Sequence, residues 1–396
     1  MENKKVFLSV DKFGQWKEKN GYSTYDQYDF WSTKYGIWSK SLYYKSRIAG
    51  SPFIAPIFLA EIFWPAFRKL FVSPKRFPIA DAHLIMGLTN IYKKVKDEKV
   101  LDEAKLIATE LLKSSVDGYS GHCWGYPFNW MTTRGLWTSG IPLITTTGYC
   151  FEAFLSLYDE TKDKKFFDIA YSIFLFTKKD IKDTIVDDKI WISSYSPFDN
   201  SQIVNANAYR SFVLAEGYKR FGDEEALNVA KRNINFILQS QNADGSWLYA
   251  VNDQRDAFVD NFHTCFVLKN LYKSNLILND KLIGEAIKNG FNFYKKNLLD
   301  EDGLPIPFAK LPRINIVKRE LYDFAEAISL CNSLQKMDEE ALTIRDKLLN
   351  EVIEKYQKKD GSFVTRVSMF GILNKIPYMR WPQSQLFYAL TNCLNN

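Results

Sequence analysis

The stretch DEEALNVAKRNINFILQ, residues 223–239, opens with three acidic residues and then has an apolar residue at every third or fourth position. Acidic groups favour a helix N-terminus, and this spacing is typical of an amphipathic helix with one wet face. Four other stretches, starting at residues 97, 163, 279 and 338, have the same pattern. In chain order the five starts are 66, 60, 56 and 59 residues apart, so the sequence predicts a helical repeat.

Between these stretches lie six segments that carry fewer charges and are apolar on more than one face, as expected of helices covered on both sides. They span residues 80–95, 145–160, 204–221, 260–274, 321–335 and 379–394. The common helical solenoids repeat every ~34 to 47 residues, so this longer period leaves room for two helices and a long connection in each unit. The pattern predicts an all-α fold, an (α/α)6 toroid in which an outer ring of helices encloses six inner ones.

We expect one domain, because no Gly/Ser-rich or Pro-rich linker interrupts the period. Residues 76–396 form the predicted toroid, and residues 1–75 supply an N-terminal wrap and the missing outer helix of the same domain. Within the wrap, PFIAPIFLAEIFWPAF (52–67) holds three prolines and Glu61 and is short for a membrane span. We interpret it as a buried wrap. The alternative is peripheral contact with a membrane surface through residues 52–72.

Composition and charge exclude several classes of protein. The net charge of +6 comes from 52 basic and 46 acidic residues without a strongly basic stretch, so we expect no nucleic-acid partner. Five widely spaced cysteines without a CxxC pair indicate reduced thiols in a cytoplasmic protein. The N-terminus has no apolar signal-peptide core, so secretion by that route is not expected. The three histidines have no metal-ligand spacing, and we expect neither a metal nor a cofactor.

Polar residues gather at the beginnings of the six inner segments. If all the inner helices run in the same direction, these beginnings converge at one mouth of the toroid. Helix N-termini present free N–H groups, which would make the mouth a favourable setting for carboxylates or hydroxyls. The residues are Asp81, His83, Thr147, Tyr149, Glu152, Asn205, Asn207, Tyr209, Arg210, Asp260, Asn261, His263, Tyr322, Asp323, Arg380, Trp381 and Gln385.

The long connections that lead into these segments carry further aromatic and charged residues, which would form the rim of one groove. Aromatic residues make up 16% of the chain, and their rings can stack on the flat apolar faces of sugars. The rim residues are His122, Trp124, Tyr126, Trp130, Arg134, Tyr195, Asp199, Trp247, Tyr249, Arg319 and Glu320.

Each of these residues also has a structural explanation. Asp81 and Asp260, like Thr147 and Asn205, could be helix caps, and Asp323 followed by Glu326 fits a capping box. A histidine on an apolar helix, such as His83, is more often a satisfied core residue, and tryptophans often fill cores. The prediction of a site therefore rests on the co-location of these residues and on no single one.

Eight motifs spread over nearly the whole chain are specific as a set. They are RFPIADAH (76–83), GYSGHCWGYPFNW (118–130), IPLITTTGYCFEAF (141–154), VNANAYR (204–210), DGSWLYAV (244–251), VDNFHTCFVLKNL (259–271), RELYDFAE (319–326) and RWPQSQLF (380–387). Through these motifs the chain resembles the VpsJ-like polysaccharide biosynthesis proteins. The resemblance implies a six-hairpin-glycosidase-like toroid that takes part in exopolysaccharide or capsule synthesis. Gly148 stands where we expect proline in the family, which slightly loosens that helix entry.

Two other resemblances are narrower. DGSW turns between helices, as at 244–247, also occur in terpene cyclases and prenyltransferases, but this chain has no DDxxD or DxDD acid cluster. The C-terminal YMRWPQSQL (378–386) is similar to the end of glucuronyl C5-epimerases.

Charge helps to choose among three functions. Guanidinium groups bind carboxylates in a two-pronged fashion, and Arg134, Arg210, Arg319 and Arg380 are all expected near the mouth. The leading hypothesis is an epimerase or lyase that abstracts a proton from an acidic, uronate-containing oligo- or polysaccharide, with Tyr or His side chains as base and donor. One alternative is a glycoside hydrolase with paired carboxylates from among Asp81, Glu152, Asp260, Glu320 and Asp323. The other is a glycan-binding or assembly protein without catalysis.

We divide the candidate residues by role. Catalytic roles are assigned to Tyr126, Glu152, Tyr209, Asp260, His263, Tyr322 and Asp323. Substrate-binding roles are assigned to Asp81, His83, His122, Trp124, Arg134, Tyr149, Tyr195, Asn205, Arg210, Trp247, Arg319, Glu320, Arg380, Trp381 and Gln385.

Overall fold

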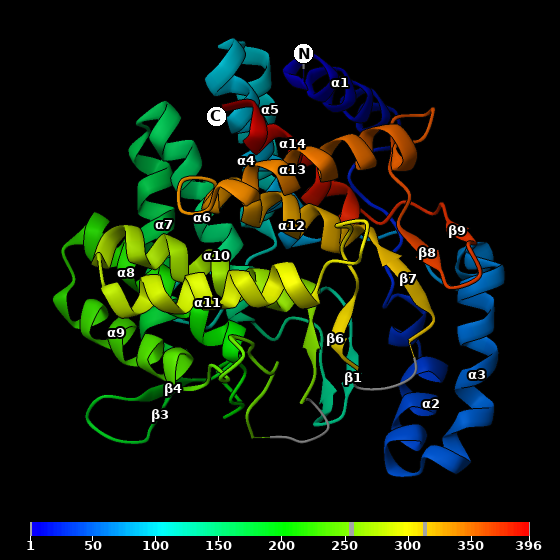
Figure 1. The fold of residues 1–396 in the computed structure, drawn as a ribbon, viewed down its shortest axis with the longest axis horizontal. Helices are drawn as coiled ribbons and strands as arrows, with labels where there is room; N and C mark the ends of the chain where they lie inside the picture. The colour runs from blue at the N-terminus through cyan, green and yellow to red at the C-terminus, as the bar shows by residue number, and fades with distance from the viewer. Residues whose placement is uncertain (1, 253–256, 312–314, 396) are drawn as a thin grey trace.

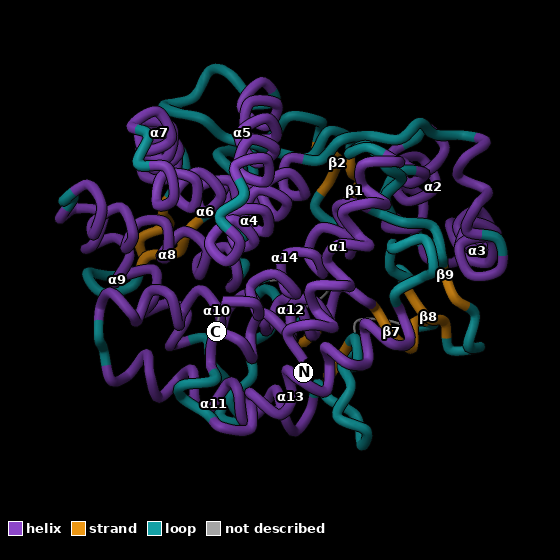
Figure 2. The backbone as a smooth tube through the Cα atoms, turned by 90° about the horizontal axis from the view of Figure 1, so that it is seen from above, coloured by secondary structure: helices purple, strands orange, loops and turns teal. Residues whose placement is uncertain are grey.

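The computed structural model describes residues 2–252, 257–311 and 315–395, and its centre is a closed ring of six helices. Each ring helix contacts the next, and the last contacts the first (Figures 1 and 2). This arrangement confirms the predicted toroid. The ring consists of α4 (Pro78–Val95), α6 (Ile144–Thr161), α8 (Val204–Phe221), α10 (Asn261–Leu278), α12 (Leu321–Leu334) and α14 (Ser384–Asn392), the last preceded by η5 (Met379–Gln383).

Six outer helices surround the ring, and Figure 2 shows them outside it. Their apolar stripes explain the repeat in the sequence: on α9, for example, Ala226, Val229, Ala230 and Ile237 are buried. The charged residues between them remain in water. The outer helices are α5 (Glu98–Lys113), α7 (Lys164–Lys179), α9 (Glu224–Gln239), α11 (Lys281–Asn297), α13 (Glu339–Glu351, continued by η4, Val352–Tyr356) and α1 (Glu2–Asn20), which lies against α14.

Four inner helices end in the same way. Each is 18 residues long, is closed by one residue in the left-handed conformation and is followed directly by an aspartate that caps the next outer helix. The left-handed residues are Lys96, Lys162, Gly222 and Asn279, with φ of 53°, 56°, 74° and 51°. The acidic start of each outer stretch is thus the N-cap of a tight corner.

The connections at the other end of the ring contain short antiparallel strands, which the sequence analysis did not predict. None of them exceeds four residues, too short for an alternating pattern to stand out. The strands are β1 (Trp130–Thr132) with β2 (Gly135–Trp137), β3 (Asp183–Ile185) with β4 (Trp191–Ser193), β5 (Val259–Asp260) with β6 (Phe308–Lys310), and β7 (Val317–Glu320) with β8 (Arg366–Ser368) and β9 (Leu373–Asn374).

In four of the inner helices the first N–H group is not free, so that expectation was wrong for them. Ile144 donates its N–H to the Tyr195 carbonyl at 3.1 Å, and Val204 donates to the Tyr249 carbonyl at 3.1 Å. Asn261 and Leu321 donate in the same way to Pro307 and Thr365, which lie in the long connection after the next outer helix. Each helix start therefore fixes the backbone of the next connection, which positions that connection's side chains at the mouth. Of the residues considered as caps, only Asp260 is one.

The N-terminal region forms a helical hairpin beside the toroid, seen in blue at the lower right of Figure 1. It consists of η1 (Phe30–Ser32), α2 (Lys34–Lys45), α3 (Arg47–Phe63) and η2 (Pro65–Leu70). Gly50 lets the two helices meet, because a Cβ there would lie 2.2 Å from the Cα of Tyr43. A small core of its own holds the hairpin together, formed by Phe30, Trp31, Ile54, Ile57 and Phe67.

The interpretation of residues 52–67 as a buried wrap is wrong for much of the segment. It is helical through both Pro52 and Pro56, and side chains such as Leu59 and Phe63 are more than half exposed. Among the described residues, no helix combines the length and the apolar character that crossing a membrane requires.

Candidate functional site

A cavity of about 520 Å³ opens where the inner helices begin. All six inner helices or their first turns contribute to its wall, together with the connections and the N-terminal hairpin. Many of the residues that line it were predicted from the sequence. These are Tyr126, Trp130, Arg134, Tyr149, Tyr195, Asn205, Tyr209, Tyr249, Asp260, His263, Glu320, Tyr322, Asp323, Arg380, Trp381 and Gln385.

Four arginines were predicted near the mouth. Arg210 and Arg319 do not line this cavity, so the prediction was wrong for these two. Arg210 is buried behind α8, where it pairs with Asp183 and donates to the carbonyl of Ile181 at 3.0 Å. Arg319 pairs with Asp300 and donates to the carbonyl of Pro305 at 3.2 Å. Both guanidinium groups fasten connections to the toroid, because a buried cation needs a carboxylate and further acceptors.

The other predicted residues outside the cavity wall also have structural partners. Glu152 pairs with Lys273 at 2.6 Å, and Asp81 with Arg76 at 2.8 Å. Trp124 and Trp247 are buried and donate their indole N–H groups to the carbonyls of Leu111 and Ile237. His83 is buried against Tyr149, and His122 lies 3.1 Å from the Ser115 hydroxyl.

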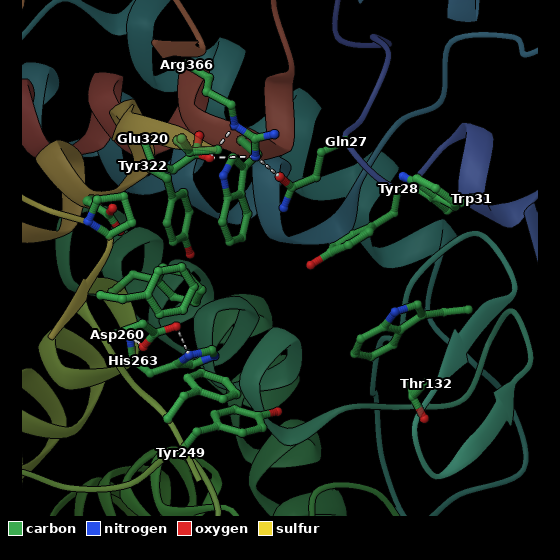
Figure 3. Close-up of a pocket in the computed structure, with 18 of the residues that line it drawn as sticks. Gln27, Tyr28, Trp31, Thr132, Tyr249, Asp260, His263, Glu320, Tyr322 and Arg366 are labelled. Atoms are coloured by element: carbon green, nitrogen blue, oxygen red, sulfur yellow. Dashed lines mark hydrogen bonds and ion pairs between the residues drawn. The ribbon is translucent and has the colours of Figure 1, made fainter. Parts of the chain in front are cut away.

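Asp260 and His263 form a hydrogen-bonded pair on the cavity wall. Asp260 caps α10, accepting from the His263 backbone N–H at 3.2 Å, and its second oxygen lies 2.7 Å from His263 Nδ1 (Figure 3). The bond to Nδ1 fixes the ring and leaves Nε2 for a ligand. The ring centroids of Tyr249 and Phe262 lie 4.5 and 4.1 Å from that of the imidazole, so its surroundings are largely aromatic.

Asp323 faces the same cavity in a different electrostatic state. Its carboxyl group is buried, and neither oxygen has a hydrogen-bond partner among the described residues. Burial, with added repulsion from Glu320 and Asp260, raises the pKa of Asp323 well above its usual value. This shift favours the protonated form of the carboxyl group, which can donate a hydrogen bond. The capping-box interpretation was wrong, because Asp323 lies inside α12 and caps nothing.

The Glu320 carboxylate is bound by an arginine of the same cavity wall, Arg366. Arg366 contacts it at 2.6 Å and also donates to Gln27 at 2.7 Å, as the dashed lines of Figure 3 show. Burial raises the pKa of Glu320, and Arg366 opposes that shift. This pairing makes Glu320 less available for acid–base work than Asp260 or Asp323.

Aromatic rings form a platform beside these carboxyl groups. Tyr322 and Trp381 stack with centroids 3.6 Å apart and planes 5° apart. Tyr149 and Tyr209 lie deeper, and burial raises the pKa of both well above 10, so both keep their protons. Gly148 lies inside α6, not at its entry, and a Cβ there would come to 3.0 Å from the Tyr209 ring. A small residue at 148 therefore leaves room for Tyr209.

The opposite wall comes from a segment that the sequence analysis did not assign to the site. Figure 3 shows Gln27, Tyr28 and Trp31 across the open space from His263 and Asp260. The aromatic and acidic stretch YDQYDFW, residues 25–31, was the signal that could have revealed it.

Arg380 connects this wall to the last inner helix. Both its Nε and its Nη2 bond the buried Asp26, at 2.8 and 2.7 Å. Its guanidinium carbon also lies 4.9 Å from the centre of the Tyr126 ring. Arg380 is thus a neutralised cation at the cavity wall and does not offer a full positive charge.

Other basic residues of the cavity lie on the side of the N-terminal hairpin. They are Lys40 on α2, Arg47 at the start of α3 and Arg134 in the β1–β2 turn. Four acidic residues also line the cavity: Asp260, Glu320 and Asp323 at the starts of α10 and α12, and Glu61 on α3, which pairs with Arg68. The histidine and three of the carboxyl groups therefore lie at the starts of α10 and α12, whereas Lys40, Arg47 and Arg134 lie on the side of the hairpin. No cluster of three or more potential metal-ligating side chains occurs within residues 2–252, 257–311 and 315–395.

Solved structures share this α/α toroid architecture. It is similar to a sugar epimerase from a ruminal bacterium, with 15% identity, a TM-score of 0.59 and coverage of 82% of this chain and 90% of that one. It is similar to cellobiose 2-epimerase from Bacillus thermoamylovorans, with 13% identity, a TM-score of 0.63 and coverage of 85% of this chain and 97% of that one. For an unsaturated glucuronyl hydrolase specific for heparin the values are 12%, 0.63, 99% and 96%.

At such low identity these similarities establish the fold alone. A comparison with protein-family models finds no match, and neither does a comparison with curated proteins. The VpsJ-like resemblance therefore stays a prediction.

Proposed function

We propose that the protein is a carbohydrate-active enzyme that removes a proton from an acidic sugar, with His263 as the base. The observation that carries the proposal is the Asp260–His263 pair on the wall of an aromatic cavity. Sugar-processing enzymes of both the epimerase and the hydrolase type have this fold. The VpsJ-like resemblance supports a surface polysaccharide as the source of the substrate.

The two sides of the cavity suit a uronate. Lys40, Arg47 and Arg134 can attract a carboxylate, and the stacked Tyr322 and Trp381 can carry the apolar face of a sugar ring. The protonated form of Asp323, which burial favours, can donate a hydrogen bond to a substrate carboxylate oxygen as negative charge develops there.

The chemistry would proceed through a proton transfer from carbon. His263 Nε2 takes the proton from the carbon next to the substrate carboxylate, and the electron pair of that C–H bond moves into an enediolate. Return of a proton to the opposite face, from a neutral hydroxyl such as that of Tyr322, gives the epimer. Departure of the substituent on the neighbouring carbon instead gives an unsaturated uronate, as in a lyase. Asp260 is a positioning residue in both cases, because it holds the imidazole.

One observation favours a glycoside hydrolase as the second candidate. Burial favours the protonated form of Asp323, whereas Asp260 accepts from the His263 backbone N–H and lies beside the imidazole. The surroundings of the two carboxyl groups therefore differ in the way that an acid and a base require. In that reaction Asp323 would protonate the leaving oxygen, and the Asp260–His263 pair would activate water.

Incubation with uronate-containing oligosaccharides in deuterated water separates these chemistries. Deuterium at the carbon beside the carboxylate, or the ultraviolet absorbance of an unsaturated uronate, supports the proposal. New reducing ends without either favour the hydrolase. Binding without any change in the sugar contradicts both and leaves a glycan-binding protein.

Variants matched in chemistry test the role of each residue. His263→Gln should abolish deuterium uptake, whereas His122→Gln, which changes a histidine outside the cavity wall, should keep it. Lys40→Gln and Arg134→Gln should raise KM for acidic oligosaccharides more than for neutral ones. Equal effects of His263→Gln and His122→Gln would contradict the assignment of the base.

A further inference from the structure

The outward face of α3 lacks the charged residues that an exposed helix face normally carries. Between Ile48 and Ala60 the helix has no charged side chain, although most of these residues are exposed. Ile48 is 90% exposed, Leu59 54% and Phe63 58%. The helix buries only Gly50, Ile54 and Ile57, so it is apolar on its buried and exposed faces alike.

Neighbouring aromatic rings extend this face. Trp38 of α2 lies against Phe53 at a centroid distance of 4.9 Å, and Phe63 stacks on Phe370 of the β8–β9 turn at 5.9 Å. All four rings are exposed by more than a third. We call the six side chains Trp38, Ile48, Phe53, Leu59, Phe63 and Phe370 the hairpin patch. Figures 1 and 2 show α3 at the outer edge of the molecule, with no other helix beyond it.

The charge around the hairpin patch has one sign. Residues 33–75 contain seven basic residues and a single acidic one, Glu61. The Glu61 carboxylate has partners within the protein. It accepts a hydrogen bond from the Trp31 indole N–H at 3.0 Å and pairs with the buried Arg68 at 3.3 Å. The exposed charges of the segment are therefore all positive: Lys34, Lys45, Arg47, Lys69 and Lys75.

We infer that the hairpin patch docks on the surface of an anionic phospholipid bilayer. Aromatic and aliphatic side chains enter the boundary between headgroups and acyl chains, while lysine and arginine side chains contact the anionic headgroups. α3 lies in the plane of the surface and does not cross it. A second copy fits the patch less well, because two patches surrounded by positive charge repel each other.

This docking would also orient the cavity. Four residues of the same hairpin line the cavity: Lys40, Tyr44, Arg47 and Phe58. The opening would then lie next to the membrane surface, where a glycan attached to a lipid would be presented. The docking itself does not depend on the proposed function and is tested without a substrate.

Flotation of the full-length protein with lipid vesicles tests the inference. The protein should float with vesicles of phosphatidylcholine and phosphatidylglycerol, less at high salt, and remain behind with phosphatidylcholine alone. The triple variant I48E/L59E/F63E should lose at least about tenfold in vesicle affinity, because it places three anions in the patch. L106E, at a 69% exposed leucine of α5, is the matched control and should float like the unmodified protein.

The basic residues are tested separately. K45E/K69E should weaken binding to the anionic vesicles by about tenfold or more, whereas K164E/K281E, at lysines 81% and 90% exposed on α7 and α11, should not. Circular dichroism checks that all variants are folded. Failure to float with anionic vesicles overturns the inference, as does flotation that I48E/L59E/F63E and L106E reduce equally. A dimer in solution that I48E/L59E/F63E dissociates would instead assign the patch to a second copy.

Discussion

The three histidines of the chain lie in three environments, and each should respond differently to ligand and to pH. His263 is bound to a carboxylate at the cavity wall, His122 is half-buried beside a serine, and His83 is buried within the ring of inner helices. Of the three, only His263 lines the cavity, where its Nδ1 is bound to the carboxylate and its Nε2 is left for a substrate. Sequence position alone could not distinguish the three environments, because each histidine lies near the start of an inner helix or in a polar connection.

At the residue scale, Asp260→Asn should separate the positioning role from the capping role. Asparagine also caps helices, so the free energy of unfolding should change by less than about 1 kcal/mol. The amide, however, can donate to Nδ1 and stabilise the wrong tautomer, so deuterium uptake should fall by about a hundredfold or more. Asp81→Asn, at a buried carboxyl group outside the cavity, is the control and should keep the uptake rate. Loss of both folding and uptake in D260N would indicate a structural role only.

His83 should make the protein sensitive to acid. Burial, aided by Lys269, lowers the pKa of His83 from 6.5 to about 3. The unfolded chain therefore binds a proton between pH 6.5 and about 3 that the folded chain does not, and stability falls as the pH falls through that window. Relative to His83→Gln, the unmodified protein should lose up to about 1.4 kcal/mol per pH unit in urea unfolding. Parallel curves for the two proteins would contradict the burial of a neutral imidazole.

At the scale of elements, the helices were predictable because their signals are local. An apolar residue every third or fourth position and an aspartate at the cap are enough to define α5, α7, α9 and α11. The short strands were not predictable, and neither were the connection residues that turn away from the cavity, because distant partners decide both. Arg319, for example, points to Asp300 and Pro305, a choice that no sequence spacing reveals.

The tight corners between inner and outer helices give a prediction of their own. Lys96 and Lys162 have positive φ, which costs a residue with a Cβ about 1 kcal/mol, whereas Gly222 occupies the same position without strain. Lys96→Gly and Lys162→Gly should each raise the free energy of unfolding by about 0.5 to 1 kcal/mol, and Gly222→Lys should lower it by a similar amount. Thermal unfolding of the three variants measures this. A loss of stability in both glycine variants would show that the lysine side chains contribute more than the strain costs.

At the scale of the molecule, the N-terminal segment completes what the ring begins. The ring closes where α14 meets α4, and Asp26 then joins the N-terminal segment to Arg380 in η5, just before α14. The repeat period predicted the ring, but not that the wrap would supply one wall of the cavity. That wall depends on contacts between residues more than three hundred positions apart, such as Asp26 and Arg380.

This closure should be measurable as stability. Asp26→Asn leaves the buried Arg380 without its carboxylate and should lower the free energy of unfolding by about 3 to 5 kcal/mol. Lys5 and Glu354 also join the two ends of the chain, but this pair is solvent-exposed and screened, so Glu354→Gln should cost far less than Asp26→Asn. Equal losses in the two variants would show that the buried pair does not hold the N-terminal segment in place.

The central claim is that acidic saccharides bind in the cavity against His263. Because the chain has only three histidines, NMR of protein labelled with 15N-histidine reports on this cavity, on the buried ring and on the outer connection separately. Titration with a panel of uronate-containing oligosaccharides should shift the His263 imidazole signals and leave those of His83 and His122 in place. Binding that shifts His122 instead, or saturating additions of the whole panel that shift none of the three, would contradict the account.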